Sequence, residues 1–303
     1  MRRILIPSLL VTLTFGLNSC SNEENSKTVS SEYITVSTEI NALTRVATDA
    51  TTGTQSFENG DQISIYAWTG DAAVAPQVSD RVVDNAINTF DGTTWTAAPQ
   101  MLWKNTVDDH YFIGVYPKNA TSVTDLTAAD YTFDVADQET SDLLVAVNVK
   151  GLKSDTNPVP LQFNHVMAML KVSLQFRNQW DGTPTVEKVI LKKAATAATV
   201  NYLTQKVTAS TTAAADIELP VTEANTKYSS IVIPQTGVKS IVITIGGKDY
   251  TYTNTDADGI KFEEGKTTKV GLIVGRNEIT LGTVSIEGWQ DGSSITDGEA
   301  QQE

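Results

Sequence analysis

Few side chains in this sequence could act as nucleophiles or general bases. The 303 residues include one cysteine, Cys20, and two histidines, His110 and His165. His165 lies in an apolar stretch, where a hydrogen-bonded core histidine is commoner than a catalytic one. The sequence contains no HExxH or GxSxG motif and no glycine-rich phosphate loop. We therefore predict no catalytic residues, no cofactor and no enzymatic activity.

Carboxylates are plentiful, but their spacing selects no catalytic pair. The chain has 36 acidic against 22 basic residues, a formal net charge of −14. A glycoside hydrolase needs two carboxylates across a cleft, and nothing in the sequence brings two particular ones together. The negative charge also repels phosphate backbones, which excludes nucleic acid as a partner.

One loop has the beginning of a calcium-binding pattern. Asn254, Asp256, Asp258 and Gly259 match N-x-D-x-D-G, but the twelfth position is Gly265 where the pattern requires glutamate. The flanks YTYT and IKF are typical of strands, not of helices. We interpret the loop as a polar hairpin turn and predict no metal, with calcium as the weaker alternative.

Cys20 lies directly behind an N-terminal secretion signal. Two arginines precede the apolar run 4–17, which is shorter than the about 20 residues of a membrane-spanning helix. Residues 17–20, LNSC, resemble a bacterial lipobox, although Asn18 departs from the usual small or aliphatic residue. The resemblance implies removal of a signal peptide, residues 1–19, and acylation of the Cys20 thiol with palmitate. The alternative is an ordinary secreted protein with a chance cysteine.

The residues after Cys20 bear on the location of the chain. Residues 21–25, SNEEN, resemble the surface-export signal of bacterial lipoproteins, and a solvated tether is the alternative. With its only cysteine acylated, the chain keeps no thiol for a disulfide or a metal. We expect a lipid-anchored protein at the outer membrane or cell surface, with a core held by burial alone.

The elements that would position these groups are β-strands. β-Branched residues and alternating patterns are frequent, and helical periodicity is rare. Glu32–Ile40 alternates, with Ile34, Val36 and Ile40 on one face. Further strands are expected at 63–67, 111–117, 131–135, 143–147, 170–176, 186–191, 230–234, 240–245, 249–253, 270–274 and 284–289.

The stretch around Pro158 is the best candidate for a domain boundary. A polar segment, 150–157, leads into Pro158-Val159-Pro160. Short strands separated by turns favour sandwiches over a parallel sheet with crossover helices. We predict an all-β protein with two β-sandwich domains, an N-terminal one at 46–157 and a C-terminal one at 158–303.

Five aromatic residues could form a sugar-stacking surface. They fall in or beside the expected strands, where aromatic side chains usually pack in the core. We favour the core interpretation for this set, which consists of Trp68, Trp95, Trp103, Tyr111 and Tyr116.

A series of short motifs runs in order along nearly the whole chain. They are the lipobox, TR at 44–45, FENGDQI and IYA at 57–67, Trp103, YF and YP at 111–117, DLLVA at 142–146, Leu161, Phe163, His165 and Ala168, IPQ at 233–235 and GW at 288–289. This series resembles the fimbrillin family, the subunits of lipoprotein-derived pili of Bacteroidetes. The resemblance implies two transthyretin-like β-sandwich domains in tandem, which agrees with the division near Pro158.

The resemblance also implies a mechanism of assembly. Residues 20–45 would form a lipidated pro-segment whose strand covers a groove with Ile34, Val36 and Ile40. An arginine-specific protease would cut between Arg45 and Val46, and a strand of another pilus subunit would fill the groove. Arg45 is the only basic residue between Lys27 and Arg81. The alternative is a surface arginine of no consequence.

The donor strand is the open part of this hypothesis. Its candidate residues are Ile279, Leu281, Val284 and Ile286, and their three-residue step suggests a bulge or a break. The segment could equally be an ordinary last strand, in which case the chain would be a tip or anchor subunit.

Two other functions remain open at this point. One is a monomeric surface lipoprotein that binds a host or bacterial glycan through its tryptophans. The other is a secreted carbohydrate hydrolase, which lacks a supporting motif. The fimbrillin resemblance favours a structural and adhesive fimbrium subunit over both.

Overall fold

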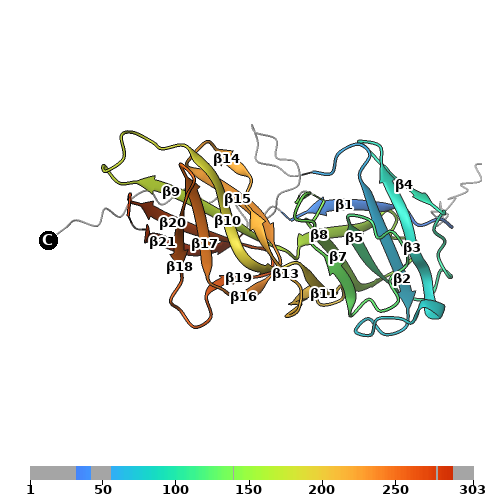
Figure 1. The fold of residues 1–303 in the computed structure, drawn as a ribbon. Helices are drawn as coiled ribbons and strands as arrows, with labels where there is room; N and C mark the ends of the chain where they lie inside the picture. The colour runs from blue at the N-terminus through green and yellow to red at the C-terminus, as the bar shows by residue number, and fades with distance from the viewer. Residues whose placement is uncertain (1–31, 42–55, 139, 278, 289–303) are drawn as a thin grey trace, which may run out of the picture.

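The computed structural model describes residues 32–41, 56–138, 140–277 and 279–288. These residues form strands and connecting loops, with a single turn of 3-10 helix, η1 (Val78–Asp80). The predicted all-β class is therefore confirmed. Figure 1 shows an elongated molecule of two lobes, with β1–β5, β7 and β8 in one lobe and β9, β10 and β13–β21 in the other. Cys20, Arg45 and Val46 lie outside the described residues.

The first lobe is built on a seven-stranded sheet that is buried on both faces. Along β2, Ile63 and Ile65 face one core, whereas Tyr66 and Trp68 face another, because successive side chains of a strand point to opposite faces. The only parallel pair in this sheet joins β1 to β8. In spatial order the strands are β1 (Val36–Ile40), β8 (Val159–His165), β7 (Leu144–Leu152), β5 (His110–Tyr116), β2 (Gln62–Thr69), β3 (Arg81–Phe90) and β4 (Trp95–Ala98).

The sheet of the first lobe continues past the predicted boundary at Pro158. β8 pairs with β7 on one side and with β1 on the other, and its apolar residues lie in the first lobe's core. The chain enters the second lobe only after His165, where Ala168 begins β9. β8 therefore belongs to the sheet of the first lobe, although it follows Pro158 in the chain.

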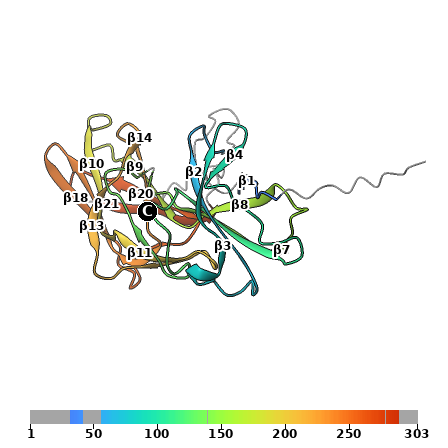
Figure 2. The same ribbon diagram turned by 90° about the vertical axis from the view of Figure 1, so that its right-hand side faces the viewer.

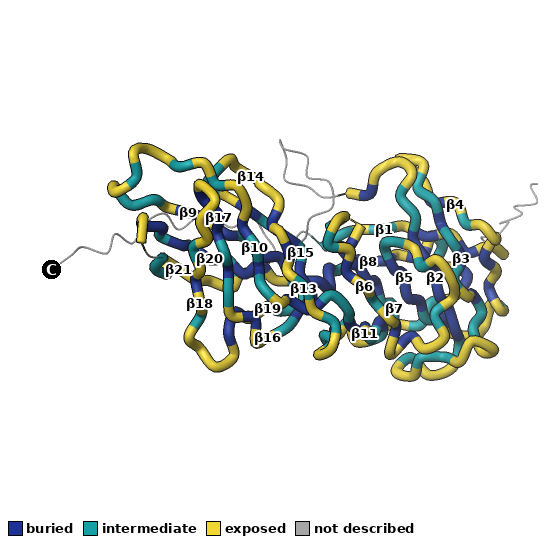
Figure 3. Tube along the Cα trace, in the orientation of Figure 1, coloured by how far each residue is buried: buried dark blue, intermediate teal, exposed yellow. Residues whose placement is uncertain are grey.

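The second lobe is a sandwich of two main sheets. Leu170 and Val172 of β9 lie in one core with Leu191 and Ile243 of the opposite sheet, and Figure 3 shows the buried stretches of these strands. One sheet has the order β14 (Val221–Glu223), β15 (Lys227–Val232), β9 (Ala168–Phe176), β20 (Lys266–Val274), β21 (Ile279–Gly288). The other has the order β13 (Ala214–Glu218), β10 (Val186–Ala195), β17 (Ser240–Ile245), β18 (Lys248–Thr253).

Two small sheets complete the fold. β16 (Gln235–Val238) pairs with β19 (Ile260–Phe262) within the second lobe. A three-stranded sheet combines β6 (Ala129–Thr132), from the first half of the chain, with β11 (Ala197–Asn201) and β12 (Lys206–Ala209), from the second. One buried cluster runs from Tyr66 and Trp68 through this small sheet into the second sandwich. Figure 2 gives the same two lobes in a perpendicular view.

Candidate functional site

The N-terminal segment Glu32–Ile40 joins the two edges of the seven-stranded sheet. On one side, β1 pairs in parallel with β8, and Figure 1 shows the two strands side by side. On the other side, the Ile34 amide donates to the Met101 carbonyl at 3.0 Å, and the Trp103 amide donates to the Glu32 carbonyl at 3.2 Å. Residues 101–103 follow β4, the opposite edge strand. The segment therefore closes the sheet around its inner core.

The closing segment buries its apolar side chains in that core. Ile34 is 2% exposed and Val36 is 6% exposed, whereas Thr38 and Ile40 are half-buried. The Trp95 indole also donates to the Thr38 hydroxyl at 3.0 Å. The predicted strand with Ile34 and Val36 inward is confirmed, and its role as a removable cover stays a prediction. The core that the segment shares includes Met101, Trp103, Val159, Leu161 and Phe163.

Amide side chains hold both ends of the closing segment. Near its start, Asn157 accepts from the Thr35 amide at 2.9 Å and donates to the Tyr33 carbonyl at 3.0 Å. At its end, Asn41 donates to Asn164 at 2.6 Å and accepts from Gln162 at 2.8 Å. Neutral hydrogen bonds of this kind contribute about 1 kcal/mol each. The sequence analysis missed these amides, because their partners lie more than 100 positions away.

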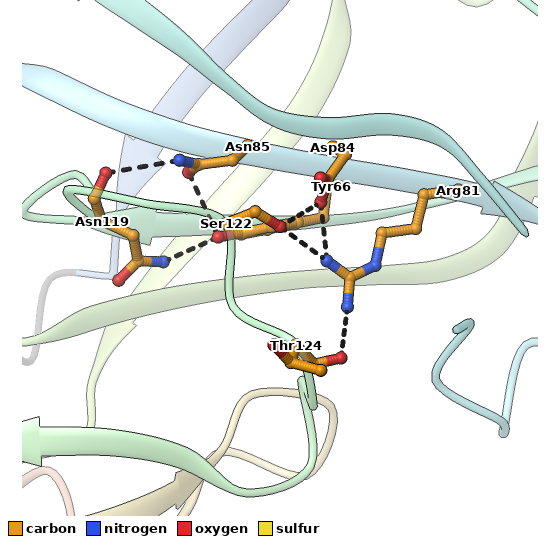
Figure 4. Close-up of polar contacts among 7 residues, drawn as sticks. All are labelled: Tyr66, Arg81, Asp84, Asn85, Asn119, Ser122 and Thr124. Atoms are coloured by element: carbon orange, nitrogen blue, oxygen red, sulfur yellow. Dashed lines mark hydrogen bonds and ion pairs between the residues drawn. The ribbon is translucent and has the colours of Figure 1, made fainter. Parts of the chain in front are cut away.

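A polar network fixes the opposite face of the sheet. Tyr66 donates to Asn85 at 3.1 Å and accepts from Asn119 at 3.0 Å. The Arg81 guanidinium lies 5.3 Å from the centre of the Tyr66 ring and donates to Asp84 at 2.6 Å. Burial raises the pKa of Tyr66, so its phenol stays a hydrogen-bonding group. Figure 4 shows that Arg81 also reaches Ser122 and Thr124, which hold the loop after β5 on the sheet.

The last described strand, β21, lies at an edge of the second sandwich. It pairs only with β20, and its apolar side chains are partly exposed to solvent. Leu281 and Val284 are each 46% exposed, and Ile286 is 37% exposed. Ile279 is half-buried against the core. The register shifts where Gly282 and Thr283 face one residue of β20, which confirms the predicted bulge. The four candidate donor residues thus lie in one long edge strand.

The two histidines occupy separate buried positions. His110 Nε2 accepts from the Lys104 amide at 3.1 Å, and burial lowers the pKa of His110. His165 Nδ1 lies 2.6 Å from the Asp142 carboxylate, at the end of β8. His110 is held by a backbone amide and His165 by a carboxylate, the kind of partner that fixes a ring in place. Both positions are those of structural histidines.

A shallow depression in the first lobe has two carboxylates in its lining. Its lining includes Tyr111, Lys104, Asp108 and Asp109. Asp108 lies 3.9 Å from the Lys104 ammonium, and Asp109 lies 3.8 Å from that of Lys153. Each carboxylate therefore faces a lysine, an arrangement unlike the facing acid pair of a glycosidase.

The calcium-like loop connects two different sheets. Asn254 Oδ1 accepts from the Asp256 amide at 2.8 Å, and the Asp258 carboxylate lies 2.9 Å from the Lys261 ammonium. β18 before the loop pairs with β17, and β19 after it pairs with β16, so the predicted hairpin is wrong. Within the described ranges, no three histidine, cysteine or acidic side chains gather as a metal site.

The tryptophans of the proposed sugar-stacking surface belong to the cores. Trp68, Trp95 and Trp103 are all buried, and they are divided between the two faces of the first sheet. Tyr111 and Tyr116 are partly buried and pack against different cores as well. The core interpretation is confirmed, and these five side chains form no common surface.

Several solved structures share this fold. A candidate cell adhesion protein from Bacteroides ovatus superposes with a TM-score of 0.66 at 18% identity, over 86% of this chain and 99% of that one. One from Bacteroides uniformis gives 0.63 at 21% identity, over 77% and 93%. A fimbrial protein from Bacteroides vulgatus gives 0.54 at 15% identity, over 84% and 99%. No curated protein matches the chain.

None of the described segments forms a helix with the length and apolar character of a membrane span.

The sequence itself matches a family. The model of the fimbrillin-like family covers residues 44–289, from the region of the predicted cut to the end of β21. The chain therefore belongs to the fimbrillin-like family.

Proposed function

We propose that this protein is a structural and adhesive subunit of a surface fimbrium. It is exported as a lipoprotein acylated at Cys20 and is assembled by exchange of strands. The family and the fold of fimbrial and cell adhesion proteins support a role in pili. The observation that carries the proposal is the closing segment. It precedes the predicted cut in the chain, and it supplies side chains to the core of the first lobe.

Removal of the closing segment would leave a groove that another strand fits. The segment occupies the place between β8 and residues 101–103, so its loss exposes two sets of unpaired backbone groups. It would also expose the apolar surface that Ile34 and Val36 cover, where each fully buried side chain contributes about 1.5–3 kcal/mol. A strand with apolar residues at alternate positions restores both kinds of contact.

We propose β21 as the strand that is donated to the next subunit. It is an edge strand, so its release breaks pairing with β20 alone. Its residues Leu281, Val284 and Ile286 are already half-exposed. The donor would gain burial that its own sandwich does not give it, which favours head-to-tail assembly of many copies or of different subunits.

The test is digestion of the full-length chain with an arginine-specific protease. We expect a cut between Arg45 and Val46, whereas Arg81 is protected because its guanidinium is buried and paired with Asp84. Intact mass would identify the cut, and size-exclusion chromatography would detect oligomers. The matched control, Arg45→Gln, should not be cut at this position and should stay monomeric. A cut chain that remains a stable monomer would favour a tip or anchor subunit, or the glycan-binding alternative.

A further inference from the structure

His110 supports residues 101–104, the stretch whose backbone pairs with the closing segment. Its imidazole is fully buried. Nε2 accepts from the Lys104 amide at 3.1 Å, and Nδ1 lies 3.0 Å from the Asp108 carbonyl, to which it can only donate. A ring that accepts at one nitrogen and donates at the other is neutral. The structure thus assigns the proton of His110 to Nδ1.

The hydrogen bond to Lys104 lies next to the backbone contacts between residues 101–103 and the closing segment. Lys104 follows Trp103, whose amide donates to Glu32. The Trp103 indole meets the His110 ring edge-on, with the ring centres 4.9 Å apart. Two residues earlier, Met101 accepts from Ile34. His110 therefore positions residues 101–104 through the Lys104 amide, while Met101 and Trp103 of the same stretch bind the closing segment.

The charges around His110 come from its own loop and from the end of β7. The Asp108 carboxylate and the Asp108 and Leu152 carbonyls favour a charged ring, and Lys104 disfavours it. Asp109 and Lys153 pair with each other, which leaves little net field. The register partners on the two flanking strands are the uncharged Thr69 of β2 and Leu152 of β7. Glu32, on the closing segment, has an exposed side chain.

We propose that His110 is a positioning residue for the N-terminal closing segment, and that protonation of its ring loosens this segment in mild acid. A protonated Nε2 carries a hydrogen and would face the Lys104 amide donor with a second donor. The hydrogen bond is then lost, and residues 101–104 lose their support. The inference rests on the proposed function for its purpose, because the same segment would be the one removed before assembly.

The direction of the pH dependence follows from burial. Burial lowers the pKa of His110 in the closed state below its ordinary value of 6.5, which a solvated ring in the opened state would recover. The opened state then binds the proton more tightly. Below pH ~6.5 the opened population should rise up to about tenfold per pH unit, until the lowered pKa of the closed state is reached. Above this window His110 stays neutral in both states, so closure is constant.

The test is amide hydrogen exchange of the full-length chain, followed by mass spectrometry from about pH 7.5 to about pH 5. Protection factors, corrected for intrinsic exchange, are compared for residues 32–40 and for β17. We expect the protection of 32–40 to fall up to about tenfold per pH unit below pH ~6.5, while β17 stays unchanged. Equal loss in β17 would indicate global unfolding and would overturn the proposal.

Three variants separate titration from packing. In His110→Gln the amide can accept from Lys104 and donate to Asp108 without titrating, so the profile should become flat. His110→Phe should lower protection of 32–40 at every pH. His165→Gln, at the only other histidine of the chain, should keep the wild-type slope. A slope that survives in His110→Gln, or a flat wild-type profile, would overturn the proposal. Either result leaves the cleavage at Arg45 untouched as a separate test.

Discussion

At the scale of single residues, Asp142 and His165 hold the passage between the lobes. Both side chains are almost inaccessible, and His165 Nδ1 lies 2.6 Å from Asp142 Oδ1. Burial raises the pKa of Asp142, and the neighbouring His165 opposes this rise. His165 ends β8, and Val166 and Met167 continue into the shared core before β9. The pair is therefore a structural contact at the turn from one sheet to the next.

We predict that His165→Phe destabilises the protein by about 3 kcal/mol near pH 7, because it leaves a buried carboxylate without its partner. The pKa of Asp142 would then rise further above its unfolded value. A carboxyl with a raised folded pKa costs stability as pH increases through that range. The loss should therefore be smaller at about pH 5 than at about pH 7.5, as measured by urea denaturation.

The double variant His165→Phe/Asp142→Leu is the matched control for this prediction. It removes the buried charge together with its partner, so most of the lost stability should return. An equal loss at both pH values, or no recovery in the double variant, would show that the pair contributes through shape alone.

At the scale of elements, the sequence predicts which residues of a strand face inward, but it does not predict which strands pair. The alternation in Glu32–Ile40 gave the inward residues Ile34 and Val36, because the period of two is a local property of a strand. Its pairing with β8 joins residues more than 100 positions apart and leaves no local trace. The prolines before Val159–His165 likewise mark a local break in the pattern, whereas the pairing of this strand with β7 leaves no local trace.

The bulge in β21 shows why one irregularity could be read from the sequence. The step from Leu281 to Val284 moves the apolar residues by three, and an extra residue in the strand keeps them on one face. Two glycines make room for it. A Cβ on Gly271 would lie 2.9 Å from Thr283 Oγ1, and one on Gly282 would lie 3.3 Å from the Gly271 carbonyl oxygen.

We predict that Val284→Glu blocks assembly with little effect on the monomer. Val284 is half-exposed, so its loss should cost only about 1 kcal/mol of folding stability. In the proposed groove of a neighbour the same side chain would be buried, where an unpaired carboxylate is strongly unfavourable. The measurement is size-exclusion chromatography after cleavage at Arg45, together with urea denaturation of the uncut chain.

The control for this prediction is Ser285→Glu, one position along the same strand. Ser285 points to the opposite face, is exposed, and lies opposite Lys269, which already pairs with the Glu287 carboxylate. This variant should still assemble. If both variants assemble as the wild type does, β21 is not the donated strand.

At the scale of the whole molecule, the two lobes share more than a linker. β6 from the first half of the chain pairs with β11 from the second. Asn119 accepts from the Tyr202 hydroxyl at 3.3 Å, and the Val145 carbonyl accepts from Gln205 at 2.8 Å. One buried apolar cluster extends across this junction. The lobes are therefore joined by a strand pair, by hydrogen bonds and by a shared apolar core.

We predict that the lobes unfold together because of this shared core. Thermal unfolding of the full chain should give one transition, with loss of amide protection in β2 and in β17 at the same temperature. Leu126→Ala removes a fully buried side chain at the junction, next to the Tyr202 amide that donates to the Leu126 carbonyl at 2.8 Å. It should cost about 2–5 kcal/mol and shift both lobes equally.

Ile63→Ala is the matched comparison, because Ile63 is buried in the inner core of the first lobe alone. In a coupled molecule this variant also lowers the transition of both lobes, since the first lobe cannot unfold without exposing the shared cluster. In an uncoupled one it lowers only the loss of protection in β2 and leaves β17 at the wild-type temperature. Two separate transitions in Ile63→Ala would therefore mean that the junction sheet joins two independent domains, and a single lowered transition would mean that the two lobes unfold as one cooperative unit.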